Sequence, residues 1–196
     1  MLGLSAYRRP EPELAAGSIR LRLPRRGDYR EWAALRNQSR DFLTPWEPRW
    51  GKDELEKAAW RERLRRYRQE FNSGAAVPLF IFDAQSGALV GGITLSNIRY
   101  GVAQCASIGY WLGEPHAGKG LMVEALEPVA VYAFQRLRLH RLEAACIPDN
   151  NRSVRVLEKA GFKREGLLRS YLKINGVWQD HLLYARVADG YGRAPQ

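Results

Sequence analysis

Hydrophobic and polar positions alternate along several stretches of the chain and recur at helical spacing along others. Alternating or wholly apolar runs predict strands at 19–23, 77–82, 88–98, 102–112, 141–147, 163–174 and 177–187. Apolar positions three or four residues apart predict a helix that begins at Asp28 and helices over 52–72, 121–138 and 150–161. Within the second of these helices, one buried stripe contains Trp60, Leu64, Tyr67 and Phe71.

The order of these elements predicts a mixed α/β fold. Three consecutive strands between residues 77 and 112 have no helix between them, which implies an antiparallel meander. The pair Asn175–Gly176 between the last two strands is typical of a type I′ hairpin turn. We expect a flexible N-terminal arm over 1–17, one domain over 18–187 and a C-terminal tail over 188–196.

Composition narrows the class of protein. Of the 196 residues, 45% are hydrophobic and 27% are charged, as in a soluble globular protein. No apolar run approaches the ~20 residues that cross a bilayer, so we expect no membrane partner. Cys105 and Cys146 lie within apolar strand-like runs, which favours buried free thiols and a cytoplasmic location.

The chain carries a net charge of +10, which favours anionic partners without choosing among them. Arginines occupy the rest of the circumference of the helix at 52–72: Arg61, Arg63, Arg65, Arg66 and Arg68. These arginines form either a solvated helix face or an electropositive ridge near RNA, and the sequence leaves both interpretations open.

A strand, a glycine-rich loop and a helix follow one another around Gly113–Gly120, which reads GEPHAGKG. Backbone N–H groups of such a loop, together with the N-terminus of the following helix, bind anions. We expect Gly118 and Gly120 to let the backbone approach a diphosphate, while Lys119 adds a positive charge. A nucleotide hydrolase would carry Ser or Thr at the position of Gly120 to hold Mg²⁺, so we expect no metal.

Several motifs occur in an informative order. They are LSNI at 95–98, GYWL at 109–112, PDNNRS at 148–153, VLEKAGF at 156–162 and YLKINGVWQDH at 171–181. Together they resemble the GNAT acetyltransferase superfamily and, within it, the RimJ branch. One position departs from the superfamily pattern, because Pro115 stands where Arg or Gln is usual. The resemblance implies a single GNAT-like domain with a mixed, mostly antiparallel sheet, flanking helices and two splayed central strands, 102–112 and 141–147.

The same resemblance implies that acetyl-CoA is the cosubstrate and that no metal takes part. It places the diphosphate on the glycine loop and the pantetheine arm between the splayed strands. The residues that it assigns to binding are Tyr110, Trp111, Leu112, His116, Ala117, Gly118, Lys119, Gly120, Leu121, Met122, Asn150 and Ser153.

For catalysis, the resemblance implies direct attack of an amine on the thioester, without an acyl-enzyme. Ser153 or Tyr171 would protonate the departing thiolate. Asp180 and His181 are candidate bases because they lie in the RimJ-like motif, although both could instead brace the final hairpin. Glu114 beside the loop is a third candidate, and a water relay is the alternative. An α-amino group has a pKa near ~8, so a weak base is sufficient.

The implied reaction is acetylation of a protein N-terminus, in the RimJ branch that of an alanine-starting protein of the small ribosomal subunit. The implied partner is therefore that ribosomal protein or the ribosome. The segment Phe42–Pro48 combines prolines with aromatic residues and forms either a substrate-side loop or part of the core. The sequence leaves three other functions open: acetylation of a small-molecule amine such as an aminoglycoside, CoA binding without turnover, and association with the ribosome through the arginine-rich helix.

Overall fold

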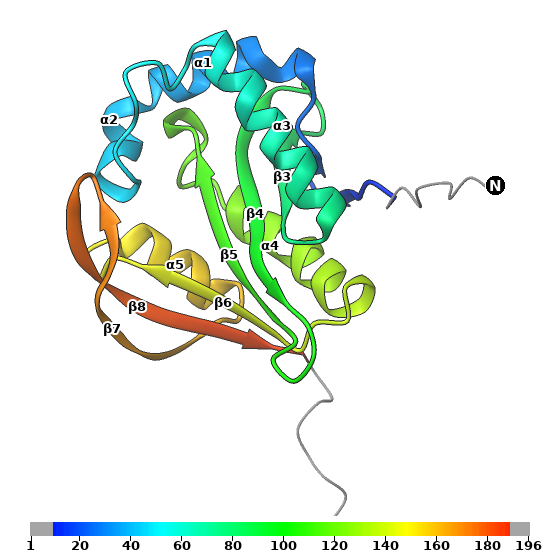
Figure 1. The fold of residues 1–196 in the computed structure, drawn as a ribbon, viewed down its shortest axis with the longest axis vertical. Coiled ribbons are helices and arrows are strands. Elements are labelled where there is room, and N and C mark those ends of the chain that lie inside the picture. Colours follow the sequence, from blue (N-terminus) through cyan, green and yellow to red (C-terminus); the bar gives the residue numbers. More distant parts are fainter. Residues whose placement is uncertain (1–9, 189–196) are drawn as a thin grey trace, which may run out of the picture.

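One eight-stranded sheet runs through the protein and carries helices on both faces (Figure 1). The computed structural model describes residues 10–188. The strands are β1 (Glu13–Ala16), β2 (Ile19–Arg22), β3 (Val77–Asp83), β4 (Leu89–Arg99), β5 (Cys105–Leu112), β6 (Arg141–Cys146), β7 (Lys163–Ile174) and β8 (Val177–Val187). The α-helices are α1 (Tyr29–Gln38), α2 (Arg40–Leu43), α3 (Lys57–Ser73), α4 (Leu121–Val131) and α5 (Asn151–Lys159). Short 3₁₀ turns η1 (Arg26–Asp28), η2 (Thr44–Trp46) and η3 (Glu114–His116) and a π-helical turn η4 (Tyr132–Arg136) complete the fold.

The strand order is β1-β2-β3-β4-β5-β6-β8-β7, and every neighbouring pair is antiparallel except β5 and β6. The meander of β3, β4 and β5 and the final hairpin of β7 and β8 confirm the predicted mixed sheet. At the tip of that hairpin Asn175 has φ 43° and Gly176 has φ 88°. Both residues are therefore left-handed, as a type I′ turn requires.

The parallel pair of strands stays together for only three residues. Cys105–Ser107 of β5 face Arg141–Glu143 of β6. Beyond them β5 continues against β4 as far as Leu112, while β6 continues against β8 as far as Cys146. The two central strands therefore splay apart, as predicted (Figure 1).

A cluster of charged and backbone contacts holds the paired end of these strands. Arg141 donates from Nε to Glu143 at 2.8 Å and from Nη1 to Glu165 at 2.9 Å. The hydrogen bond from Arg141 lowers the pKa of Glu165. The N–H groups of His140 and Arg141 both donate to the carbonyl of Gln104, at 2.6 and 3.1 Å. These contacts fix the point from which β5 and β6 diverge.

The two faces of the sheet pack against different helices. Successive side chains of β3 alternate between them, so Leu79 joins the core under α4 and α5, whereas Phe80 faces α1 and α3. On the second face the ring centroid of Trp60 lies 4.9 Å from that of Trp32 and 5.9 Å from that of Phe80. Phe80 in turn meets Trp111 edge-on at 6.4 Å. This aromatic cluster ties α1 and α3 to the middle of the sheet.

Both predicted terminal segments belong in part to the sheet. The prediction of an N-terminal arm is wrong for Glu13–Ala16, which pair with β2 and place Leu14 against the core. A strand of four residues is too short for its alternation to stand out in the sequence. The prediction of a tail is wrong for Ala188, which is buried and donates its N–H to the carbonyl of His140 at 2.9 Å. Residues 1–9 and 189–196 lie outside the described part of the chain.

Two predicted helices differ at their ends. The helix expected over 52–72 begins only at Lys57, because the preceding residues form turns. The helix expected over 121–138 is α-helical as far as Val131 and continues as η4. Pro128 lies inside the α-helical part, one turn before the change to π-helical geometry.

Replacing Trp60 by alanine should remove the centre of the aromatic cluster. Trp60 is 1% exposed, so the shorter side chain would leave a cavity between α3 and the sheet. We expect the free energy of unfolding to fall by about 3–5 kcal/mol, measured by urea denaturation. Trp178→Ala is the matched control, since Trp178 is 61% exposed, and should change that free energy by less than about 0.5 kcal/mol. Equal losses in the two variants would contradict this description of the core.

Candidate active site

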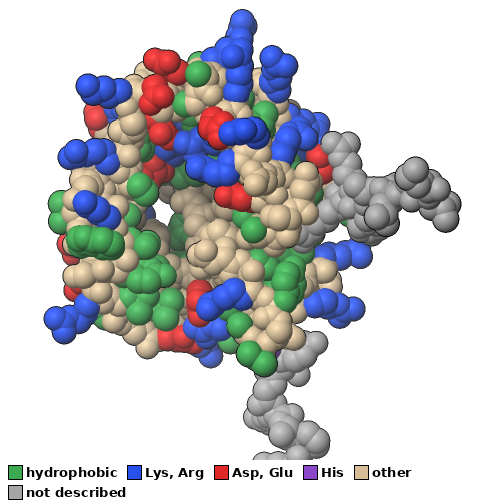
Figure 2. Space-filling model, in the orientation of Figure 1, with side chains coloured by type: hydrophobic (Ala, Val, Ile, Leu, Met, Phe, Trp, Pro, Cys, Tyr) green, Lys and Arg blue, Asp and Glu red, His purple; other side chains and the backbone are tan. Residues whose placement is uncertain are grey.

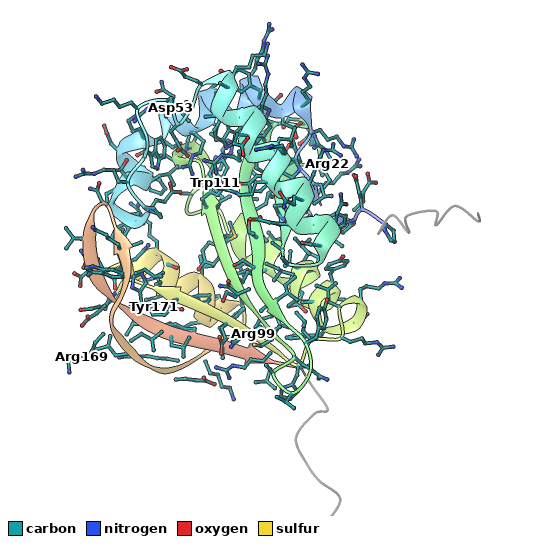
Figure 3. The ribbon with its side chains drawn as sticks, in the orientation of Figure 1. Arg22, Asp53, Arg99, Trp111, Arg169 and Tyr171 are labelled. Atoms are coloured by element: carbon teal, nitrogen blue, oxygen red, sulfur yellow. The ribbon has the colours of Figure 1, made fainter. Side chains whose placement is uncertain are left out.

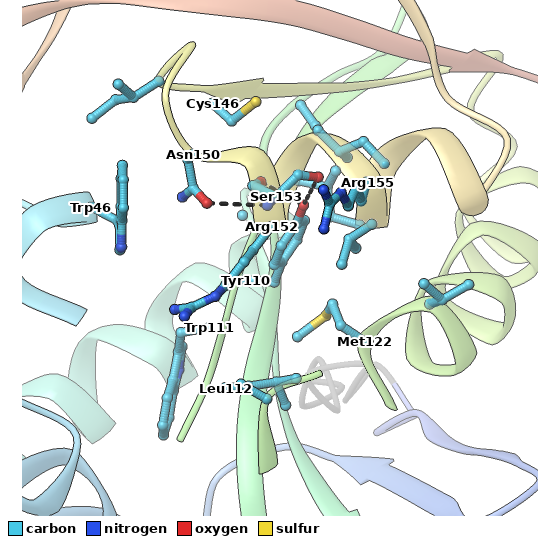
Figure 4. A pocket seen from close by; sticks show the side chains of 18 of the residues that line it. Trp46, Tyr110, Trp111, Leu112, Met122, Cys146, Asn150, Arg152, Ser153 and Arg155 are labelled. Atoms are coloured by element: carbon cyan, nitrogen blue, oxygen red, sulfur yellow. Dashed lines mark hydrogen bonds between the residues drawn. The ribbon is translucent and has the colours of Figure 1, made fainter. Parts of the chain in front are cut away.

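A pocket of about 590 Å³ opens where β5 and β6 part (Figure 4). The molecular surface is hollowed at this place (Figure 2). The predicted site residues that line the pocket are Tyr110, Trp111, Leu112, Ala117, Gly118, Gly120, Met122, Asn150, Ser153 and His181. Those that do not line it are His116, Lys119, Leu121, Tyr171 and Asp180. The fold therefore brings most of the predicted residues from β5, the glycine loop, α4 and α5 into one cavity.

The glycine loop has the geometry of an anion-binding turn. Gly118 has φ 77° and Gly120 has φ 83°, which are left-handed values that suit glycine. A Cβ at either glycine would meet no atom within 4 Å, so the backbone is open to an approaching group. Helix α4 begins at Leu121, directly after the loop, and its first N–H groups have no carbonyl partner within the helix. These features fit a diphosphate held by backbone amides.

His116 is a neighbour of the loop and not part of the pocket wall. Partial burial and, to a smaller extent, the charge of Lys119 lower the pKa of His116, whereas Asp83 acts in the opposite direction. The imidazole is therefore mainly neutral at pH 7 and adds no positive charge to the loop. Glu114 precedes it in η3 and also lies outside the pocket lining.

The start of α5 brings three predicted residues together. Asn150 caps the helix, because its Oδ1 accepts the N–H of Ser153 at 3.1 Å. The Ser153 hydroxyl lies 2.8 Å from the hydroxyl of Tyr110 on β5. Burial raises the pKa of Tyr110 well above its usual range, so this phenol stays protonated. The result is a pair of linked hydroxyl groups in the wall of the pocket (Figure 4).

Trp111 is fixed from several sides. A Cβ on Gly92 of β4 would lie 2.7 Å from its Nε1, so the indole rests directly on bare backbone. Phe80 contacts the ring edge-on, and the guanidinium of Arg36 lies 5.0 Å from its centroid. Together with Phe42 and Trp46, which also line the pocket, Trp111 forms what we call the aromatic wall.

A buried ion pair supports this wall. Arg36 donates two hydrogen bonds to the carboxylate of Glu47, at 2.8 and 2.6 Å, and its guanidinium lies 4.3 Å from the centroid of Trp50. Trp50 Nε1 donates to the same carboxylate at 2.8 Å. The carbonyl of Glu47 accepts the N–H of Asn175 at 2.9 Å, which docks the tip of the β7–β8 hairpin against the loop after η2. The segment that the sequence suggested as a substrate-side loop thus borders the pocket.

The last three candidate catalytic residues occupy different positions. His181 is 3% exposed, lines the pocket and places Nδ1 3.0 Å from the carbonyl of Gln179. Asp180 accepts the N–H of Ser170 at 2.7 Å and so braces a bulge in β7. Tyr171, on β7 in Figure 3, is 44% exposed and meets the His181 ring edge-on at 5.7 Å. Of these three residues, only His181 faces the cavity.

Sequence reasoning missed three cations on α5. Arg152, Arg155 and Lys159 line the pocket at helical positions i, i+3 and i+7. The guanidinium of Arg152 lies 4.7 Å from the ring centroid of Phe42. Within residues 10–188 none of the three takes part in an ion pair. Their regular spacing after Asn150 was the signal that could have revealed them.

Membrane-spanning helices and metal sites are absent from the same part of the chain. Among residues 10–188, no helix is long and apolar enough to cross a membrane. No group of three or more His, Cys, Asp or Glu side chains in these residues is arranged to hold a metal ion. Cys105 and Cys146 are buried free thiols, and burial raises the pKa of Cys146, which lines the pocket.

Comparison with known proteins gives a consistent result. A family model described as the acetyltransferase (GNAT) domain matches residues 18–163. The chain is 40% identical over 158 residues to the probable N-acetyltransferase YjcK of Bacillus subtilis, covering 81% of this chain and 87% of that protein. It is 32% identical over 176 residues to the [ribosomal protein uS5]-alanine N-acetyltransferase of Escherichia coli, covering 90% of this chain and 91% of that one.

The fold agrees with these sequence matches. The structure of Mycobacterium smegmatis RimJ in complex with CoA-disulfide superposes with a TM-score of 0.85 at 32% identity, covering 96% of this chain and 92% of that chain. The ribosomal-protein-S5-alanine acetyltransferase of Vibrio fischeri superposes with a TM-score of 0.84 at 29% identity, covering 93% of this chain and 100% of that one. The chain therefore belongs to the GNAT acetyltransferase family, and its relatives include proteins of the RimJ branch.

Proposed function

We propose that this protein transfers the acetyl group of acetyl-CoA to the N-terminal α-amine of a protein that begins with alanine. Two of the relatives named above, from Escherichia coli and Vibrio fischeri, have names that give an alanine of a ribosomal protein as the acetylated residue. The observation that carries the proposal is the pocket at the parting of β5 and β6. This pocket is continuous from the N–H groups around Gly118 and Gly120 to the aromatic wall. Acetyl-CoA and the acceptor amine can therefore meet in one cavity.

The donor site consists mainly of backbone. The amides of the glycine loop and the first turn of α4 would hold the diphosphate, and the free edge of β5 would pair with the amide groups of the pantetheine arm. Asn150 uses Oδ1 for its cap and keeps its amide N–H₂ to donate to the same arm. Acetyl-CoA would supply a reactive thioester at the end of that arm, and Ser153 and Tyr110 are the residues that we expect to border it.

The acceptor must lose a proton before it attacks. Because the carbonyl of Gln179 can only accept, the proton of the neutral His181 ring lies on Nδ1 and the lone pair on Nε2. Nε2 is then the group that accepts the amine proton, directly or through water. A peptide α-amine, with a pKa near ~8, is partly neutral at pH 7, whereas a lysine side chain near ~10.4 is almost fully charged. An N-terminal amine therefore needs less help from a base than a lysine side chain does.

The leaving CoA thiolate needs a proton donor of its own. The linked hydroxyls of Ser153 and Tyr110 are protonated groups in the wall of the pocket, and we assign them the role of proton donor. The alternative donor suggested by the sequence, Tyr171, is half exposed and lies outside the pocket lining.

The arginine-rich helix gives less support to a role in RNA binding. Three of its five arginines are already paired with carboxylates: Arg63 with Glu54, Arg65 with Glu62 and Arg66 with Glu70. Such pairing is typical of a solvated helix face. The buried free thiols fit a reducing cytoplasm, where ribosomal proteins are made.

The choice of acceptor is tested by a panel of amines. We expect release of the CoA thiol with a peptide that starts with alanine, and at least about tenfold less release with the same peptide blocked at its N-terminus. Thiol release is followed with a chromogenic disulfide reagent. A preference for an aminoglycoside or for an internal lysine would contradict the proposed acceptor.

The donor site is tested by Gly118→Glu. The added carboxylate would repel the diphosphate, and we expect the Kd for CoA to rise at least about tenfold, measured by titration calorimetry. Gly87→Glu is a matched control, because Gly87 is also left-handed, with φ 74° and open space at its Cβ, but lies in the β3–β4 turn. Unchanged CoA affinity in Gly118→Glu would remove the loop from the donor site.

The proton-donor assignment is tested by Tyr110→Phe. We expect kcat at pH 7 to fall about 10–100-fold, with the KM for acetyl-CoA nearly unchanged. The deficit should shrink above about pH 9, because a thiol with a pKa near ~8.5 leaves as the thiolate without help. Tyr171→Phe serves as the comparison and should keep near-wild-type kcat. A pH-independent loss in Tyr110→Phe would point to a packing role instead.

A further inference from the structure

The charge of the pocket lining is unbalanced. Arg152, Arg155 and Lys159 project from α5 to its wall without a carboxylate partner among residues 10–188. The carboxylate of Glu47 also lines the pocket, but Arg36 already neutralises it. A pocket of this composition is suited to an anion with more than one negative charge.

The three cations lie at different distances from the aromatic wall. Arg152, in the first turn of α5, stacks on Phe42 and so lies beside the aromatic wall. Arg155 and Lys159 follow one and two turns later, about 4.5 and 10 Å further along the helix axis at a rise of ~1.5 Å per residue. In Figure 4, Arg155 lies on the side of Ser153 that is away from Trp46.

The neighbouring carboxylate on α5 does not cancel these two charges. Glu158 lies next to Lys159 in sequence, but its Oε1 accepts the hydroxyl of Tyr184 at 3.2 Å, against β8. Arg155 and Lys159 are both exposed, so their charged ends can meet a ligand without first breaking a contact in the fold.

The backbone N–H groups of the glycine loop supply the hydrogen-bond donors that a diphosphate needs. The cations of α5 are therefore available to bind a second anionic group. Coenzyme A carries one on its ribose, a 3′-phosphate monoester that holds between one and two negative charges at pH 7. An arginine fork and a lysine ammonium are the side chains that bind such a group by charge-assisted hydrogen bonds. We propose that Arg155 and Lys159 form a subsite for the 3′-phosphate of CoA. This assignment rests on the proposed function and identifies the part of acetyl-CoA that α5 would bind.

The test compares CoA with 3′-dephospho-CoA as ligands of the full chain, by titration calorimetry. For the wild type we expect a Kd about tenfold lower for CoA than for dephospho-CoA. Arg155→Ala and Lys159→Ala should each raise the Kd for CoA about three- to tenfold and change that for dephospho-CoA less than about twofold. The double variant should bind both ligands equally. Thermal unfolding of each variant checks that the fold is kept.

Arg61→Ala is the charge-matched control, since Arg61 is an exposed arginine on α3 that does not line the pocket. It should leave both Kd values unchanged. Equal weakening of CoA and dephospho-CoA by Arg155→Ala, or equal affinity of the wild type for the two ligands, would overturn the 3′-phosphate subsite while leaving the proposed function intact. Failure of the wild type to bind either ligand at millimolar concentration would overturn the proposed function itself.

Discussion

The early separation of β5 from β6 is the constraint on which the rest of the site depends. Backbone N–H and C=O groups inside a fold are costly unless something pairs with them. Each strand keeps one complete partner, β4 for β5 and β8 for β6, so the sheet tolerates an open seam between them. That seam gives a peptide-like ligand a row of backbone groups to bind.

The seam has supports at both of its ends. At the closed end, Arg141 and the shared carbonyl of Gln104 hold the last paired residues in register. At the open end, the hairpin tip at Asn175 reaches across to the carbonyl of Glu47. The opening is therefore bridged by a contact between two segments that are far apart in the chain.

Local pattern was enough to predict the sheet, the glycine loop and the cap of α5, because each depends on residues close in sequence. The hydroxyl pair of Tyr110 and Ser153 was not predictable, since it joins a strand and a helix through residues that are 43 positions apart in sequence. Tyr171 shows the opposite case. It lies in an informative motif, but a bulge in β7, with Ser170 at φ 45°, breaks the alternation that would have indicated its direction.

Charged residues at the pocket were missed for a different reason. An arginine on a helix has the same sequence signature whether it faces solvent, as on α3, or a cavity, as Arg152 does on α5. Arg36 was assigned no role because its partners, Glu47 and the two indoles around it, come together only when α1 packs beside β5. Such clusters belong to the tertiary structure and leave no local signal.

The contact between Gly92 and Trp111 bears on how the family can diversify. Because no Cβ fits between the β4 backbone and the indole, the combined side-chain volume at positions 92 and 111 is limited. A variant that enlarges residue 92 has to shrink residue 111, and the aromatic wall then changes shape in a single coupled step.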